Sequence, residues 1–139
     1  MANGRKPRDR YLSMMAVLFS ILALSNCTKA LQYLRAPAHL GIVIFGVRFE
    51  SVRANLLLGP MMGAVLAAYA YGLWKRRAWV AALSVVYAFY VTVNLVLFWY
   101  HQTGTDLPPL SGLVGYLAVA FTGSIGTALY IAYHRDKLA

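Results

Sequence analysis

Four long apolar stretches occupy most of this 139-residue chain and confine nearly all of its charges to the gaps between them. The stretches cover residues 11–34, 54–74, 78–100 and 112–133. Each is long enough to cross a bilayer core of about 30 Å, because a helix rises about 1.5 Å per residue. Hydrophobic residues make up 60% of the chain and charged residues 12%, which is outside the range of soluble globular domains. The sequence therefore predicts a single all-α integral membrane domain over residues 1–139, a polytopic four-transmembrane-helix bundle.

The formal net charge of +9 follows the membrane topology and does not indicate a nucleic-acid partner. Nine of the 13 lysine and arginine residues lie in the basic head, in the short turn between the second and third stretches, or in the tail. The other four, Lys29, Arg35, Arg48 and Arg53, lie at or toward the opposite face. Because positive charge gathers on the cytoplasmic side of membrane proteins, we expect both termini in the cytoplasm. The expected location is a bacterial inner membrane, with the lipid bilayer as the surrounding partner.

Small residues recur on one face of three of the four predicted helices. They follow a three-then-four spacing, which is typical of helices that pack against each other at a shallow angle. In lipid, small side chains let helix backbones approach closely and gain dispersion contacts. We predict that the following residues pack between helices: Ser13, Ala16, Ser20 and Ala23; Gly59 and Gly63; and Gly112, Gly115, Gly123 and Gly126.

The third stretch differs because Tyr87, Tyr90, Asn94 and His101 form a polar and aromatic stripe on one side of it. Asn94 needs a hydrogen-bond partner, because an unsatisfied amide in hydrocarbon costs several kcal/mol. The stripe favours a polar contact between helices or, as the alternative, a polar pocket for a small ligand or a lipid headgroup.

Lys29 is the charged residue that falls inside a predicted span, and an ionisable group at such a depth is a candidate for function. On a helical wheel it lies nearly opposite the small-residue face, so we expect it to point away from the bundle core. It also lies about five residues from the outer end of its stretch, within snorkelling reach of the interface. Pairing with a neighbouring protein or an anionic lipid, or a role in transport, are the alternatives.

The segment between the first and second stretches is rich in β-branched and aromatic residues over positions 41–52. Gly46 and Val47 suit a two-residue type II′ turn, so the sequence predicts a short β-hairpin lying over the outer end of the bundle. A re-entrant or interfacial segment is the alternative. An isolated hairpin is marginally stable in water, so it must pack on the bundle or on another chain. Phe45 and Arg48 are its candidate contacts to a partner or ligand.

The sequence contains no recognisable set of catalytic groups. No span carries paired carboxylates, and there is neither a Ser-His-Asp set at a plausible depth nor a glycine-rich phosphate cradle. A single cysteine and three histidines at different depths do not match a structural zinc site or a bis-histidine haem site. We therefore expect no enzymatic activity, no catalytic residues, no cofactor and no metal ion.

The favoured interpretation is a non-catalytic accessory or structural subunit. It would pack against a membrane-protein partner in a larger complex, or self-assemble as a homo-oligomer. The alternative is a small transporter or a lipid- or quinone-binding protein that uses the stripe of Tyr87, Asn94 and His101. That alternative predicts an internal polar cavity beside the stripe.

Overall fold

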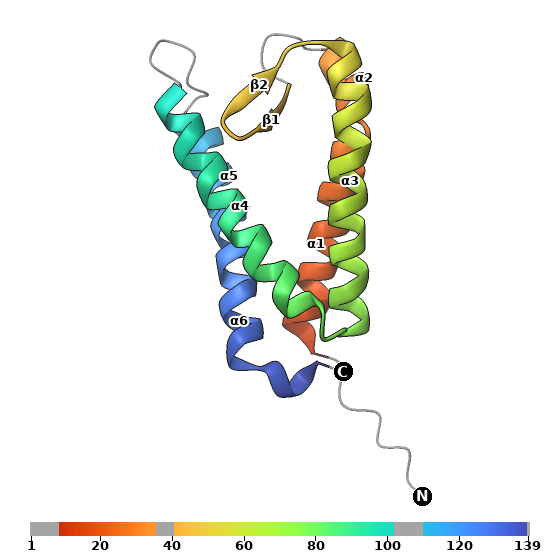
Figure 1. Ribbon diagram of the computed structural model, residues 1–139, viewed down its shortest axis with the longest axis vertical. Coiled ribbons are helices and arrows are strands. Elements are labelled where there is room, and N and C mark those ends of the chain that lie inside the picture. The colour runs from red at the N-terminus through yellow and green to blue at the C-terminus, as the bar shows by residue number, and fades with distance from the viewer. Residues whose placement is uncertain (1–8, 36–40, 102–109, 139) are drawn as a thin grey trace, which may run out of the picture.

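The computed structural model describes residues 9–35, 41–101 and 110–138, and these form helices with one small sheet (Figure 1). The basic residues that precede residue 9 lie outside the described residues. In chain order the elements are α1 (Arg10–Cys27), α2 (Lys29–Arg35), β1 (Ile42–Ile44), β2 (Val47–Phe49), α3 (Val52–Lys75), α4 (Val80–His101), α5 (Leu110–Phe121) and α6 (Thr127–Tyr133). A π-helical segment, Thr122–Gly126, joins α5 to α6.

Three helices in the described part of the chain are long and apolar enough to cross a membrane. They are α1, α3 and α4, with 18, 24 and 22 residues. A further apolar helix, Leu117–Tyr133, is shorter at 17 residues. The chain is therefore a helical protein with membrane-compatible helices, and its fourth helix is shorter than the other three.

Local sequence explains where the helices begin and end. The side chain of Asp9 accepts hydrogen bonds from the backbone amides of Tyr11 and Leu12, which satisfies two of the free donors at the start of α1. Ser51 caps α3 in the same way by accepting from the amide of Ala54 at 3.1 Å. The basic turn between α3 and α4 ends α3 at Arg76, which adopts the left-handed conformation with a φ of 53°.

The tightest helix contact joins α1 and α3, and glycines make it possible. A Cβ atom added at Gly59 would lie 2.5 Å from the carbonyl oxygen of Asn26. One added at Gly63 would lie 2.9 Å from the carbonyl oxygen of Ala23. Both distances are shorter than real Cβ contacts, so the two backbones approach as closely as they do only because these positions lack side chains.

The buried core continues from this contact toward the α3–α4 turn. Phe19 of α1 and Tyr69 of α3 are each about 1% exposed, and their ring centroids lie 4.5 Å apart. Val80 of α4 and Ile131 of α6 complete the same cluster. At this end the start of α1 is tied to α6, because the hydroxyl of Tyr130 donates to Asp9 at 2.7 Å and the rings of Tyr130 and Tyr11 stack.

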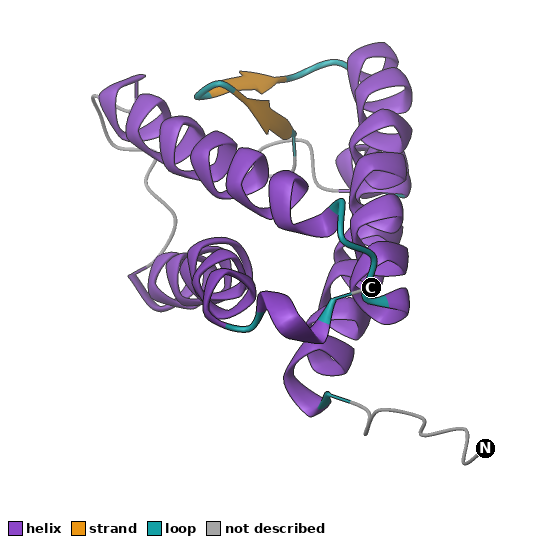
Figure 2. Ribbon diagram, turned by 60° about the horizontal axis from the view of Figure 1, so that its bottom comes forward, coloured by secondary structure: helices purple, strands orange, loops and turns teal. Residues whose placement is uncertain are grey.

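The helices form two arms that meet at the α3–α4 turn and separate toward the opposite end (Figure 1). The α1–α3 arm contains α1 and α3 side by side. The α4–α6 arm contains α4 and the helix formed by α5 and α6, which contact each other through α6 and the π-helical segment. Figure 2 shows that α4 and α5 lie apart from each other and that both lie apart from the α1–α3 arm. The β-hairpin lies between the two arms at their open end.

The hairpin is present where the sequence predicts a short one, but its turn is displaced by one residue. The strands pair Ile44 with Val47, so the two turn residues are Phe45 and Gly46 instead of Gly46 and Val47. Phe45 and Gly46 have φ values of 48° and 77°, and positive φ at both central positions is the type I′ pattern. The predicted type II′ turn is wrong because the glycine occupies the second turn position, where it also faces the backbone of Leu97 in α4.

We expect Gly63→Ala to lower the free energy of unfolding by about 1–3 kcal/mol, because the new methyl group forces α1 and α3 apart. Gly115→Ala is the matched control. A Cβ atom at Gly115 meets no atom within 4 Å, and alanine raises helix propensity by up to about 1 kcal/mol. Unfolding in mixed micelles with increasing denaturing detergent measures both variants. Equal stability of the two proteins would contradict the close contact at Gly63.

Candidate functional site: a cavity between the two arms

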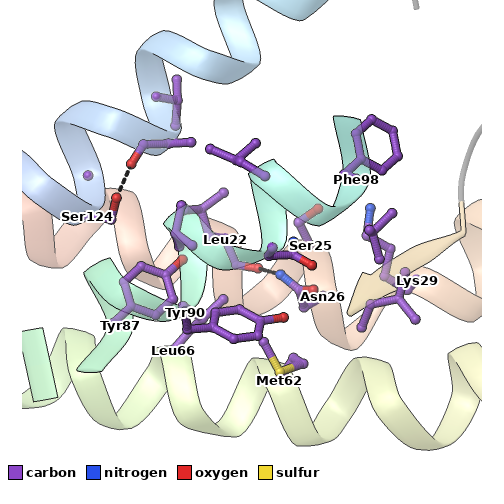
Figure 3. A pocket seen from close by; sticks show the side chains of 18 of the residues that line it. Leu22, Ser25, Asn26, Lys29, Met62, Leu66, Tyr87, Tyr90, Phe98 and Ser124 are labelled. Carbon is purple, nitrogen blue, oxygen red and sulfur yellow. Dashed lines mark hydrogen bonds between the residues drawn. The ribbon is translucent and has the colours of Figure 1, made fainter. Parts of the chain in front are cut away.

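A cavity of about 530 Å³ lies between the two arms beneath the hairpin, and we call it the inter-arm cavity (Figure 3). Its apolar wall includes Phe19 and Leu22 of α1, Leu66 of α3 and Leu95 of α4. Its polar lining residues are Ser25, Asn26, Lys29, Arg48, Asn94 and Ser124. The cavity therefore combines a large apolar surface with polar groups, and two of those groups are cationic side chains.

Asn94 joins the hairpin to the wall of the cavity. Its side-chain oxygen accepts a hydrogen bond from the backbone amide of Gly46 at 2.9 Å, and the residue is only 7% exposed. The partner that the sequence requires for Asn94 is thus the tip of the hairpin and not another helix. A Cβ atom at Gly46 would overlap the backbone of Leu97, so the hairpin tip contacts α4 directly.

Asn55 of α3 holds the other end of the hairpin. Its side-chain oxygen accepts from the amide of Ile42 at 2.8 Å, and its amide nitrogen donates to the carbonyl oxygens of Phe49 and Ser51. Asn55 is completely buried. The two asparagines together attach the hairpin to both arms, so the hairpin forms one wall of the cavity at the open end of the arms.

Lys29 lines the cavity, so the predicted orientation away from the core is wrong. On the helical wheel Lys29 lies on the same face as Leu22 and Ser25 of α1, which also line the cavity. This face therefore points into the molecule although it carries no small-residue pattern, and α2 begins at Lys29 directly after a single non-helical residue, Thr28. Lys29 is half-buried and its ammonium group donates to the side-chain oxygen of Gln32 at 3.4 Å.

Gln32 is itself held in place by the end of α1. Its amide nitrogen donates to the carbonyl oxygen of Ser25 at 2.9 Å and to the hydroxyl of Thr28 at 2.9 Å. These bonds turn the amide oxygen of Gln32 toward Lys29. Because an ammonium group has three N–H donors, this contact leaves donors of Lys29 available at the cavity.

Arg48 of β2 is the second cation that lines the cavity. Its guanidinium carbon lies 5.8 Å from the ring centroid of Phe98, within the range of a cation–π contact. Its Nε atom is buried and has no hydrogen-bond partner. A buried guanidinium donor without an acceptor is energetically unfavourable.

Tyrosines of the predicted stripe form the aromatic part of the wall. Tyr87 packs edge-on against Phe19, with ring centroids 5.4 Å apart, and Tyr90 packs edge-on against Phe45 at 5.6 Å. Both tyrosines line the cavity, whereas Phe45 is 55% exposed at the hairpin tip. The structure thus brings Lys29, Arg48, Tyr87 and Asn94 to one cavity.

His101 does not join them. It is exposed at the end of α4, and its Nδ1 atom lies 2.7 Å from the carbonyl oxygen of Leu97 on its own helix. The stripe on α4 therefore divides into cavity residues and a terminal histidine. Within residues 9–35, 41–101 and 110–138, no three His, Cys, Asp or Glu side chains lie close enough together to hold a metal ion.

The residues predicted to pack between helices occupy different environments. Ala16 and Ala23 are buried in α1, and Ser13 is half-buried. Ser20, however, is exposed and donates its hydroxyl to the carbonyl oxygen of Ala16, so it does not pack against a second helix in this chain.

The glycines of the fourth helix also differ from one another. Gly123 and Gly126 face α1 at ordinary contact distances, with Phe19 and the hydroxyl of Tyr11 as neighbours. Gly115 faces open space, which contradicts a packing role within the chain. Gly112 lies in α5, and its surroundings are outside the described part of the structure.

Sequence reasoning missed Asn55, Gln32 and Asn26 as contributors to the site. Asn55 carries a usable signal, because it is a polar residue at the start of a predicted span and requires a partner in the same way as Asn94. Gln32 bonds to Ser25 and Thr28, two helical turns and one helical turn before it, and such local spacing gives no signal of a cavity in the sequence. Asn26 faces the cavity and donates to the carbonyl oxygen of Leu22 on its own helix (Figure 3).

No protein-family model, curated protein or solved structure matches this chain. The geometry of the inter-arm cavity is therefore the basis for inferring a function.

We expect Asn94→Leu to loosen the hairpin, because the amide of Gly46 loses its acceptor in an environment where water cannot replace it. The free energy of unfolding should fall by about 1–3 kcal/mol, and amide hydrogen exchange should accelerate at residues 42–49. Thr92→Val is the control, because Thr92 is exposed and its hydroxyl bonds only to Ala88 of the same helix. Unchanged exchange at the hairpin in Asn94→Leu would show that this hydrogen bond does not hold it.

Proposed function

We propose that this protein binds an amphipathic molecule of lipid or quinone size in the inter-arm cavity, as a small transporter or binding protein of the membrane. The observation that carries the proposal is the cavity itself, which has an apolar wall on α1, α3 and α4 and a polar end near the hairpin. Its volume of about 530 Å³ lies within the usual range for small-molecule sites, which is about 300–1,000 Å³.

The packing of the helices supports a bound molecule. Membrane helices associate through dispersion contacts and hydrogen bonds, so a large gap between two arms forfeits much of the attraction that holds a bundle together. A molecule that fills the gap and contacts both arms supplies those contacts. The open end of the arms is also the end at which the hairpin contributes hydrogen-bonding groups and charge.

The proposal includes four membrane crossings, with both termini in the cytoplasm of a bacterium. Two observations support an even number of crossings. The fourth helix continues from α5 through the π-helical segment to α6 without an intervening loop. The contact of Tyr130 with Asp9 then brings the end of α6 next to the start of α1.

A topology measurement tests this part of the proposal. A reporter that fluoresces only in the cytoplasm should be active when fused to the C-terminus, and a periplasmic phosphatase fused there should be inactive. The same pair of reporters fused after His101 should give the reverse pattern, because α4 then ends outside. An active phosphatase at the C-terminus would contradict four crossings.

Filling the cavity tests ligand binding. Ala120 lines the cavity on α5, so Ala120→Phe should occupy its volume and reduce the amount of bound amphipathic molecule that co-purifies by at least about tenfold. Ala118→Phe is the matched control, because Ala118 lies on the same helix with its side chain exposed. Native mass spectrometry of protein purified in mild detergent measures the bound molecule. Equal retention by both variants would contradict binding in the cavity.

The role of accessory subunit in a larger complex or self-assembly stays a prediction, as does the absence of enzymatic activity. Large apolar side chains on the outside of the helices, such as Leu24 and Phe89, are 67% and 71% exposed. Such surfaces fit lipid chains as well as a protein partner, so they do not favour association over ligand binding. The cavity gives ligand binding the stronger support.

A further inference from the structure

Two positively charged side chains, Lys29 and Arg48, line the polar end of the inter-arm cavity. Lys29 lies at the same end of the cavity as Phe98, whereas Tyr87 and Ser124 lie at the other end (Figure 3). Arg48 approaches the ring of Phe98, so it also belongs to that end. Two cations from separate elements, one at the start of α2 and one on β2, therefore line the same part of the cavity.

Neither cation has an acidic partner in the part of the chain that the structure describes. The carboxylates there are Asp9, Glu50 and Asp136, and none of them forms an ion pair with Lys29 or Arg48. Asp9 instead caps α1 and accepts from Tyr130 at the opposite end of the molecule. Because an uncompensated charge in a low-dielectric environment is unfavourable, an anion at this end would stabilise both side chains.

The other polar groups at this end already have hydrogen-bond partners in the chain. Ser25 accepts from Gln32, Asn26 donates to Leu22, and Asn94 accepts from Gly46. The Nε atom of Arg48 is the buried donor that lacks an acceptor. Lys29 and Arg48 are the cationic donors that line this end, and cationic donors bind an anionic oxygen more strongly than a neutral one such as a quinone carbonyl.

Both cations are also held in position. The amide oxygen of Gln32 contacts the ammonium group of Lys29, and Asn55 and Asn94 fix the hairpin that carries Arg48. Gly41 leaves space for the stem of Arg48, because a Cβ atom there would lie 2.9 Å from its Cγ atom. An arginine fork beside a lysine point charge is the combination that proteins use to bind phosphate.

We infer that Lys29 and Arg48 bind a phosphate group of the amphipathic molecule, while its apolar part lies against α1, α3 and α4. This inference rests on the proposed function, in which the cavity binds such a molecule. The ligand class is thus an anionic phosphate ester of the phospholipid type. A phosphate group can reach this site from a bilayer lipid or as a soluble phosphate, and the experiment below separates these two sources.

The test is a binding measurement on the full chain in detergent. Phosphatidylglycerol and diacylglycerol with the same acyl chains are titrated and followed by native mass spectrometry. We expect phosphatidylglycerol to bind at least about tenfold more tightly, because charge-assisted hydrogen bonds form only with the phosphate. Inorganic phosphate alone is tested by its effect on the melting temperature. Stabilisation by phosphate without binding of phosphatidylglycerol would support the phosphate site and assign it a soluble ligand.

Charge-matched variants distinguish binding of phosphate by Lys29 and Arg48 from a general electrostatic attraction between anionic lipid and this basic protein. Lys29→Gln with Arg48→Gln should abolish the preference for phosphatidylglycerol, whereas Arg35→Gln with Arg53→Gln should preserve it. The second pair removes the same two charges from exposed positions. Lys29→Arg with Arg48→Lys keeps both charges and should retain most of the preference, which distinguishes a lost site from a misfolded protein. An equal loss in the two glutamine pairs would overturn the inference.

The outcomes also separate this inference from the proposed function. If diacylglycerol or a quinone binds the wild-type protein as tightly as phosphatidylglycerol, the cavity binds an amphipathic molecule but the phosphate assignment is wrong. If a fatty acid binds as tightly as phosphatidylglycerol, a carboxylate site replaces the phosphate site. If no amphipathic molecule and no phosphate binds, both the inference and the proposed function fail.

Discussion

The structure depends on one constraint, which is that a backbone amide buried between helices must have an acceptor. The hairpin between the two arms satisfies this constraint through two asparagines. Asn55 accepts from Ile42 on the side of α3, and Asn94 accepts from Gly46 on the side of α4. Because the hairpin is bonded to both arms, it holds them apart at one end. The inter-arm cavity is the space that results, and the position of Arg48 is set by the same two hydrogen bonds.

The parts of the fold that follow from local sequence could be predicted, and the parts that follow from contacts between elements could not. Hydropathy indicates the spanning helices, and β-branched residues beside Gly46 indicate a hairpin. The direction of Lys29 was predicted wrongly, because a pattern of small residues marks only the face of α1 that meets α3. The face that carries Leu22, Ser25 and Lys29 lines the cavity and has no such pattern. The turn was wrong by one residue because the contact of Gly46 with α4, which requires a glycine, is a tertiary contact. The polar stripe on α4 predicted an internal cavity as one alternative, but the presence of Lys29 and Arg48 in its lining depends on contacts between elements and was not predicted.

The spacing of small residues along a helix predicts a packing face only in part. Gly59 and Gly63 lie at a backbone contact with α1, whereas Gly115 has the same type of spacing and faces open space. The pattern identifies a face on each helix, but it does not identify which helix will meet that face. The α1–α3 arm is closely packed because Gly59 and Gly63 of α3 meet the backbone of α1 at Asn26 and Ala23. The α4–α6 arm contacts it closely only near the α3–α4 turn, which leaves the other end to the hairpin and the cavity.

The groups that support the hairpin therefore determine the chemistry of the cavity. Asn55, Asn94, Ser25 and Gln32 are engaged in bonds within the chain, so the uncompensated character of the polar end comes from Lys29 and Arg48. A molecule that contacts both arms and the hairpin binds the folded arrangement alone, so its binding free energy adds to the stability of that arrangement. Ligand affinity and hairpin position are then linked, because anything that displaces the hairpin moves Arg48 away from the lysine on α2.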